Sequence, residues 1–449
     1  MCHADGRPMW ARGTPQPSNP SSSGSLAASV VNREITSCDS VPELETVFSE
    51  HSGSFDYIHA SAALVKYAKL RGSSMSSPFF SKLATVWLKR LPDSGSHGYA
   101  NVLWACSKLG SSKHPVWAET WRAFLDLVRK DLGGDQPPSV LPQQLSNVLY
   151  ACAKLRQQPQ TDELLLLLEA FVHPAVLGAA APQAIANVVW SLGTLSKLPG
   201  MEAQGSQELL QQLLTPQLLE KLPAEGISQN VANVLVGLGR MCTGSTPLLS
   251  TAAAQGYAGQ LLSGVRLNKL SSWQPQDITN IMWALSELQL RDEGFVRAAV
   301  AASPVWLPRS TPFDLTQAAT ACAELQYRDE QFMELLLQQG QQLLQPNRRS
   351  RGKPLSESSK ASLAGQFCVS VVLLNMTGLA DTARRIVADR NFPRQTHEHP
   401  SNMRRLWVFH SWLLEHQLLD GKGLVELVSE QQLQLGVKEA AVWGDKTRL

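Results

Sequence analysis

A single motif recurs along most of the 449-residue chain, and its strongest copy is GYANVLWACSKLG at residues 98–110. The other copies are LSNVLYACAKL (145–155), IANVVWSLGTL (185–195), VANVLVGLGRM (231–241), ITNIMWALSEL (278–288), LTQAATACAEL (315–325), ASAALVKYAKL (60–70) and GQFCVSVVLL (365–374). In each copy the last apolar residue lies eight positions after a central Asn, or after the Ala62, Gln317 or Gln366 that replaces it. A fixed internal spacing of this kind indicates a repeat protein.

The spacing of apolar residues within each copy predicts an α-helix, here called the A helix. With the central Asn as position 0 and 100° per residue, positions −2, +1, +2, +5 and +8 fall on one arc of about 120°. These positions are mostly Leu, Ile, Val, Met or Cys, so the arc is the core-facing side of an amphipathic helix. Positions −1, +4 and +6 flank this arc and mostly carry Ala, Ser or Gly. We therefore expect successive A helices to pack closely side by side.

A second helical segment, the B helix, follows each A helix, and several B helices have Pro or an acidic residue near the start. The expected B helices are 78–91, 115–132, 161–172, 206–222, 248–262, 293–302, 329–344 and 379–390. Together the helix pairs predict an all-α fold, a right-handed α-α superhelix (solenoid) of about eight repeats. The repeat array is expected at residues 53–390. A linker and C-terminal capping helices, at 403–417 and 423–435, are expected within residues 391–449.

The N-terminal region has a different composition from the repeats. Residues 1–40 are rich in Ser, Pro and Gly, contain Arg7, Arg12 and Arg33, and have few acidic residues. This composition is typical of an organellar transit segment, and equally of a disordered tail. Residues 1–52 are therefore expected to be disordered or transit-like. No apolar run reaches about 18 residues, so we expect no membrane-spanning helix.

Composition and motifs argue against a catalytic or metal-binding protein. The cysteines form no CxxC pair, and Cys106, Cys152 and Cys322 all occupy position +5, where we expect small buried hydrophobic residues. Phosphate-loop, nucleophile-elbow and zinc-protease motifs are absent from the sequence. His397 and His399 lack a nearby Cys or a cluster of acidic residues, as a zinc site would require. The sequence therefore predicts no enzyme activity, no cofactor, no metal and no small-molecule substrate.

The side of the A helix opposite the core holds positions 0, +3 and +7. In most strong copies these positions carry Asn, an aromatic residue and a basic residue, respectively. Lys69 is also basic at +7, whereas Glu287 and Glu324 are acidic there. Amides can read base edges, aromatic rings and Arg can stack on bases, and Lys can neutralise phosphate. The candidate RNA-binding residues are Asn101, Trp104, Lys108, Asn147, Tyr150, Lys154, Asn187, Trp190, Asn233, Arg240, Asn280 and Trp283.

A structural interpretation of the same rows stays open. The Asn residues could form a hydrogen-bonded ladder between neighbouring helices, the Trp residues could wedge between them, and the basic row could be a solvated edge. Position −3 is polar and variable, as a base-reading code requires and as an unconstrained surface position also shows. Its polar members are His59, Gln144, Asn230, Asp277 and Asp314. The net charge of +2 is close to neutral, so any basic surface must be local.

The copies NVLWACSKL, NVVWSLGTL and NIMWALSEL, each followed by a Leu-rich helix, resemble octotricopeptide repeats of green-algal proteins. These repeats are related to the FAST-kinase-like, Leu-rich proteins of mitochondria. The resemblance covers roughly residues 55–390 and implies an α-solenoid that binds organellar RNA, with the chloroplast favoured over the mitochondrion. RRLWVFHSWLLE at 404–415 also resembles the stretch that precedes a RAP domain in many relatives, but the RAP domain itself is not seen. Its activity is therefore not carried over.

We therefore predict a single-stranded RNA-binding factor that acts in transcript stability, processing or translation. Its expected partners are organellar RNA and other RNA-processing or ribosome-associated proteins. If each repeat contacts about one nucleotide, the footprint is on the order of eight nucleotides. The alternative is a protein-binding scaffold of the HEAT or armadillo kind, whose helix pairs have a similar period. The near-neutral net charge favours this alternative modestly.

Overall fold

The structure, a computed structural model, describes residues 24–199, 205–243, 247–344, 357–388, 400–418, 423–424, 434 and 436–438. All regular secondary structure within these ranges is helical, as the sequence predicted. The chain divides into two compact units, residues 1–127 and 128–449, and their boundary falls inside helix α6 (Pro115–Leu132). Each unit is described separately below.

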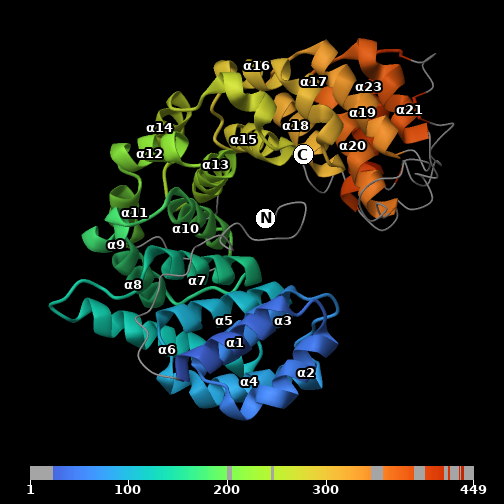
Figure 1. The fold of residues 1–449 in the computed structure, drawn as a ribbon. Helices are drawn as coiled ribbons and strands as arrows, with labels where there is room; N and C mark the ends of the chain where they lie inside the picture. Colours follow the sequence, from blue (N-terminus) through green and yellow to red (C-terminus); the bar gives the residue numbers. More distant parts are fainter. Residues whose placement is uncertain are drawn as a thin grey trace. The chain divides into compact units, whose positions relative to one another are not determined.

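Unit 1 contains three A-type helices that pack in succession, with α3 lying between α1 and α5 (Figure 1). Its helices are α1 (Gly24–Ser37), α2 (Val41–His51), η2 (Ser52–Ser54), α3 (Tyr57–Lys69), α4 (Pro78–Arg90), η3 (Leu91–Asp93), α5 (Ser96–Leu109) and the first part of α6. The helices α3 and α5 are the predicted A helices at 60–70 and 98–110. The helix α4 is the predicted B helix between them.

The N-terminal region differs from the expectation of a disordered segment ending at residue 52. Residues 24–51 form α1 and α2, which pack on α3. Two pairs of apolar residues spaced by four, Val31 with Ile35 and Leu44 with Phe48, are buried and give each helix an apolar side. Because these residues contribute to the core of unit 1, the packed structure starts before residue 53.

Unit 2 continues the alternation of A and B helices. Its A helices are α7 (Pro142–Leu155), α10 (Pro182–Leu195), α13 (Ser228–Cys242), α15 (Pro275–Glu287), α18 (Pro312–Glu324), α20 (Glu357–Leu373) and α23 (Pro400–Glu415). The other helices are α8 (Thr161–Val172), α9 (Pro174–Gly178), α11 (Ser206–Leu213), α12 (Pro216–Glu225), α14 (Thr251–Ser263), η4 (Leu267–Ser272), α16 (Glu293–Ala301), α17 (Ser303–Trp306), η5 (Leu307–Arg309), α19 (Glu330–Leu344), η6 (Thr377–Leu379) and α21 (Ala380–Ala388). Each A helix of this unit packs against the next one along the chain (Figure 1).

The predicted core stripe of the A helices is confirmed. On α15 the stripe positions −2, +1, +2, +5 and +8 are fully buried, and they are Ile278, Ile281, Met282, Leu285 and Leu288. Five A helices of unit 2 begin with Pro in their first turn, where its missing N–H costs no hydrogen bond. The cysteines at +5, Cys106, Cys152 and Cys322, are buried, and burial raises the pKa of each thiol. They are small core residues, as predicted.

Small residues on both flanks of the stripe bring the A helices together, also as predicted. A Cβ atom on Gly193, at position +6 of α10, would lie 2.4 Å from the carbonyl oxygen of Gly237, at position +4 of α13. A Cβ on Gly237 would lie 2.5 Å from the carbonyl oxygen of Val189. Cβ atoms do not approach other atoms this closely, so only glycine permits this helix spacing.

The B helices match their predicted ranges closely except for the segment 206–222. That segment is two helices, α11 and α12, because Pro216 disfavours helical geometry at the residue before it. Thr215 then caps α12 by accepting a hydrogen bond from the Leu218 N–H. Of the predicted C-terminal capping helices, the first is α23, which packs on α20 as the next A helix would. The second, at 423–435, lies almost entirely outside the described residues.

Candidate nucleic-acid interface

The Asn row at position 0 is less accessible than the sequence suggested. Asn147, Asn233 and Asn280 are only 8%, 7% and 4% exposed, and Asn101 and Asn187 are half-buried. The close packing of the A helices covers this side of each helix with the helices before and after it. Asn147, Asn233 and Asn280 therefore lie between helices, not on an open surface.

At one step the Asn row forms the interhelical hydrogen bond that the structural interpretation requires. The Gln317 side chain on α18 donates from Nε2 to Oδ1 of Asn280 on α15, at 3.1 Å. The Thr279 hydroxyl donates to Oε1 of the same glutamine at 3.2 Å. Two other amide atoms of the row, Oδ1 of Asn233 and Nδ2 of Asn280, are buried without a hydrogen-bond partner. The Asn row thus makes a hydrogen bond between helices at one step, while other amide atoms of the row are buried without a hydrogen-bond partner.

The aromatic and basic rows contact each other in unit 2. The Tyr150 ring on α7 lies 5.3 Å from the Trp190 ring on α10, measured between centroids. The Arg240 guanidinium on α13 lies 5.7 Å from the Trp190 ring centroid and 5.6 Å from that of Trp283 on α15. One cation is therefore held between two indole rings from the flanking helices, at cation–π distance from both.

Hydrogen bonding fixes the Arg240 side chain in this arrangement. Its Nη1 donates to the Thr194 hydroxyl on α10 at 2.8 Å. Burial lowers the pKa of the guanidinium, while the charge of Glu287 acts in the opposite direction. The indole Nε1 of Trp190 is buried without a hydrogen-bond partner. We call Trp190, Arg240 and Trp283 the Trp–Arg–Trp stack, which joins three consecutive A helices.

Unit 1 contains half of the same arrangement. The Lys69 amine, at position +7 of α3, lies 5.7 Å from the centroid of the buried Trp104 ring, at position +3 of α5. Lys69 is exposed as a whole residue, but its amine lies against the ring, and burial of the amine lowers its pKa, with a further lowering from the charge of Lys66. The +7 cation of one helix therefore contacts the +3 ring of the next helix in both units.

The remaining basic residues of the row, Lys108 and Lys154, are exposed at the ends of their A helices. Toward the C-terminus the row becomes acidic. Glu287 accepts a hydrogen bond from the Thr243 hydroxyl at 3.0 Å, and Glu324 is exposed. The basic character of the row is thus confined to the A helices before α15.

The base-reading interpretation of position −3 is wrong for its polar members. All five are buried, and four accept a hydrogen bond from a backbone N–H three residues earlier, so they cap their helices. The capping residues are His59, Gln144, Asn230 and Asp314. The fifth, Asp277, accepts a hydrogen bond from the Ser228 hydroxyl at 2.6 Å. Four of these polar side chains accept hydrogen bonds from backbone N–H groups at the starts of their helices. Because all five are buried, they do not contact RNA.

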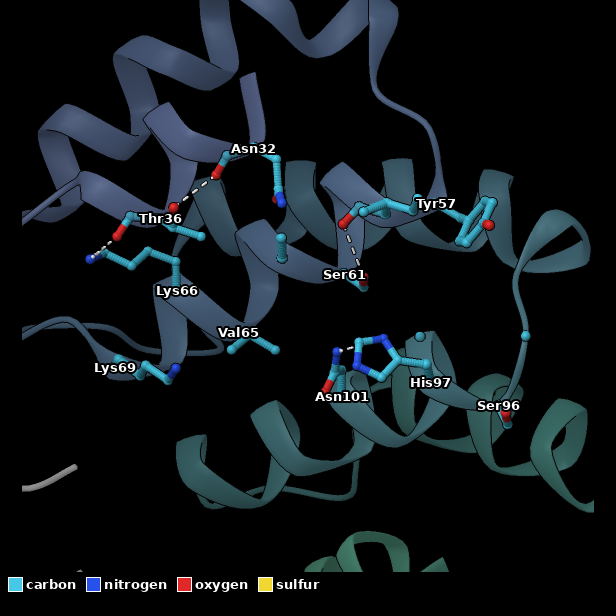
Figure 2. A pocket seen from close by; sticks show the side chains of 14 residues that line it. Asn32, Thr36, Tyr57, Ser61, Val65, Lys66, Lys69, Ser96, His97 and Asn101 are labelled. Atoms are coloured by element: carbon cyan, nitrogen blue, oxygen red, sulfur yellow. Dashed lines mark hydrogen bonds between the residues drawn. The ribbon is translucent and has the colours of Figure 1, made fainter. Parts of the chain in front are cut away.

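An open groove of about 540 Å³ lies in unit 1 between α1, α3 and α5 (Figure 2). Asn32 points into it from α1, and Asn101 lies on the opposite side, with its amide 3.4 Å from Nδ1 of His97. Lys66 and Lys69 border it, and the Lys66 amine donates to the Thr36 carbonyl at 2.8 Å. The described lining residues are all neutral or basic: Asn32, Thr36, Tyr57, Ile58, Ser61, Ala62, Val65, Lys66, Lys69, Gly95, Ser96, His97, Gly98 and Asn101.

The groove forms where α3 departs from the repeat pattern. Ala62 stands at position 0, where other copies have Asn, and Val65 stands at +3, where four copies have an aromatic residue. The shorter side chains leave space that the larger ones would fill. Sequence reasoning selected Asn101 but not Asn32, Lys66 or His97. The signal for this site was the pair of small residues in α3 beside a retained cation at +7.

Other candidate sites find no support in the described part of the chain. No group of three or more His, Cys, Asp or Glu side chains there could hold a metal ion. His397 and His399 lie outside the described residues, and so does the Arg- and Lys-rich stretch NRRSRGK at 347–353. Among the described helices, none is both long and apolar enough to cross a membrane. Neither a protein-family model nor a curated protein matches the sequence.

Proposed function

We propose that this protein binds single-stranded RNA along the side of its A helices that carries positions 0, +3 and +7, within a right-handed solenoid of about eight helix pairs. The observation that carries the proposal is the groove of unit 1. It brings one amide of the Asn row, that of Asn101, and the amide of Asn32 together with two lysines, and its described lining contains no carboxylate. Single-stranded nucleic acid is bound by positively charged grooves with nearby planar groups. The footprint is on the order of eight nucleotides if each repeat contacts one.

The organellar part of the proposal rests on the resemblance to octotricopeptide repeats and on the composition of residues 1–40. In it, the protein acts in the chloroplast, in transcript stability, processing or translation, by binding and not by catalysis. RNA-processing or ribosome-associated proteins are further partners. A fluorescent fusion of the full chain tests the location, and signal confined to the cytosol would contradict it.

A salt titration tests RNA binding. The full chain is titrated with a single-stranded RNA of about ten nucleotides at several salt concentrations. Each phosphate contact contributes about 0.7 to the slope of log affinity against log salt. Replacing Lys66 and Lys69 with Met should therefore reduce the slope by about 1.4. The matched control replaces Lys82 and Lys89, two exposed lysines of the B helix α4, and should leave the slope unchanged.

An equal loss in both double variants would show that only general charge matters, and no salt-dependent binding would remove the proposal. A second variant tests the face in unit 2, where Asn147, Tyr150 and Lys154 become Ala together. Because Asn147 is buried, this variant is compared with wild type only after its melting temperature shows that it is folded.

The protein-scaffold alternative is favoured by a separate observation, the acidic end of the +7 row at Glu287 and Glu324. An acidic surface fits a basic protein segment better than RNA. Chemical crosslinking of the full chain in an organellar extract separates the two functions. Crosslinks from Lys108 and Lys154 to RNA support the proposal, and crosslinks from Glu324 to protein without RNA support the scaffold.

A further inference from the structure

The groove of unit 1 lacks an aromatic ring that the corresponding place in unit 2 contains. In the Trp–Arg–Trp stack, the cation on α13 has one ring from the preceding helix and one from the following helix. In unit 1 the cation on α3, Lys69, has the Trp104 ring from the following helix. The preceding helix, α1, lines the groove with Asn32 and Thr36, neither of which is aromatic. The space beside the cation on the α1 side is open.

The groove has the dimensions and polarity of a site for one nucleotide. Its volume of about 540 Å³ is within the range of small-ligand pockets. The side-chain oxygen of Asn32 is buried without a hydrogen-bond partner. A buried acceptor of this kind is costly unless a ligand supplies a donor. Lys66 and Lys69 stand at one border, where a phosphate group would be neutralised.

We propose that this groove is a subsite for a single adenine nucleotide of the bound RNA. The base takes the place of the missing ring over the Lys69 amine, and the Asn32 side chain turns so that its Oδ1, buried in the unbound protein, accepts a hydrogen bond from the exocyclic amine. The phosphate contacts Lys66 and Lys69. This inference rests on the proposed RNA binding and adds to it a defined pocket with a preferred base.

Calorimetry with mononucleotides tests the subsite separately from binding of longer RNA. The full chain is titrated with adenosine 5′-monophosphate, inosine 5′-monophosphate and adenosine. We expect one adenosine monophosphate per chain. Inosine monophosphate has a carbonyl where adenine has its amine, so it leaves the Asn32 acceptor unpaired and should bind roughly tenfold more weakly. Adenosine lacks the phosphate and should bind more weakly by a similar factor.

Two variants locate the binding. Ala62→Trp fills the groove and should abolish adenosine monophosphate binding. Asn32→Leu keeps the groove but removes the acceptor, so it should bind adenosine and inosine monophosphates equally. This second variant still tests the subsite if Ala62→Trp does not fold. Lys82→Met is the matched control, since it removes an exposed lysine of the B helix α4 and should leave nucleotide binding unchanged.

The outcomes separate the subsite from the function. If longer RNA binds but adenosine monophosphate does not, the subsite is wrong and RNA binding stands. The same conclusion follows if longer RNA binds and adenosine monophosphate binds equally to wild type and to both groove variants. If adenosine monophosphate binds in the groove while longer RNA binds no tighter, the subsite stands and extended RNA binding fails. Equal affinity of wild type for the adenosine and inosine monophosphates would overturn the assignment to adenine.

Discussion

The helices α3 and α13 occupy comparable places in the two units but have different surroundings. Both carry valine at +3, Val65 and Val236, and a cation at +7, Lys69 and Arg240. On α13 the cation is enclosed by two tryptophan rings and held by a hydrogen bond. On α3 the cation has one such ring and borders an open groove. The valine at +3 and the cation at +7 are thus part of a closed interhelical contact in unit 2, whereas in unit 1 they border an open groove.

The difference shows that the role of a repeat residue depends on the residues of the helices beside it. The distance between helices adds to this effect. The pair α10 and α13 meets at two glycines, Gly193 and Gly237, whereas the corresponding positions on α3 and α5 are Ala68 and Ala105. A pair of glycines permits a closer approach of two helices than a pair of alanines does, and in unit 2 large residues in the rows then close the surface. In unit 1, small residues in the row leave it open.

The largest expected effect is on the glycine contact that closes the surface of unit 2. In Gly237→Val, the Cβ would lie 2.5 Å from the Val189 carbonyl oxygen, so α10 and α13 must move apart. We expect a loss of about 3 kcal/mol, the upper end of ordinary overpacking costs. Denaturation by urea measures it. The control Gly256→Val places its Cβ in open space on α14 and should change stability by less than about 1 kcal/mol.

Equal destabilisation by the two valine variants would show that glycine at this contact is not a packing requirement. The comparison between the units would then lose one of its two physical causes, the closer approach of α10 and α13.

The next largest effect is the difference in stability between removing the charge of Arg240 and removing that of Lys69. Arg240→Met keeps an aliphatic side chain but removes two cation–π contacts and the hydrogen bond to Thr194, and should cost about 2 kcal/mol. Lys69→Met removes one contact of a side chain that is exposed overall, and its melting temperature should change much less. Thermal unfolding followed by tryptophan fluorescence measures both. A larger decrease in melting temperature for Lys69→Met than for Arg240→Met would contradict the distinction between the closed Trp–Arg–Trp stack and the open groove.

Much of the fold could be predicted from the sequence because it depends on local spacing. The apolar stripe, the small flanking residues and the buried cysteines are set by positions within one helix, and these predictions were confirmed. The contacts between rows were not predictable in the same way. Whether Arg240 meets Trp190 or solvent depends on how neighbouring helices are offset, which one repeat does not specify.

The capping role of position −3 has a signal in the sequence. Asp56 stands three residues before His59, and Thr311 three residues before Asp314, which is the spacing of a capping box. The groove also had a signal, the replacement of Asn by Ala62. Its α1 border was not predictable from the repeat pattern, because α1 is not a recognisable copy of the motif.

A smaller effect tests the helix starts, which differ between α7 of unit 2 and α5 of unit 1. At the start of α7, Gln144 accepts a hydrogen bond from the Leu141 N–H at 2.9 Å, whereas α5 starts at Ser96 after Gly95, without a side-chain cap. Gln144→Ala should cost about 1 kcal/mol, measured by urea denaturation, and leave RNA affinity unchanged. The neighbouring exposed residue provides the control Gln143→Ala, which should be neutral. A loss of base preference in Gln144→Ala would restore the base-reading interpretation.

The smallest expected effect is the pH dependence of the open groove. Burial, and secondarily Lys66, lowers the pKa of Lys69 below its ordinary 10.5, so its amine loses its charge at a lower pH than an exposed lysine. As the pH rises toward the ordinary lysine pKa, adenosine monophosphate affinity should fall in wild type as Lys69 deprotonates, and should fall less steeply in Lys69→Met. Fold stability should respond in the opposite direction. A lowered lysine pKa disfavours the charged form in the folded state, so this contribution to stability rises with pH up to the unfolded pKa. Lys82→Met is the surface control. If adenosine monophosphate affinity falls equally steeply with pH in wild type and in Lys69→Met, the Lys69 amine does not contact the phosphate.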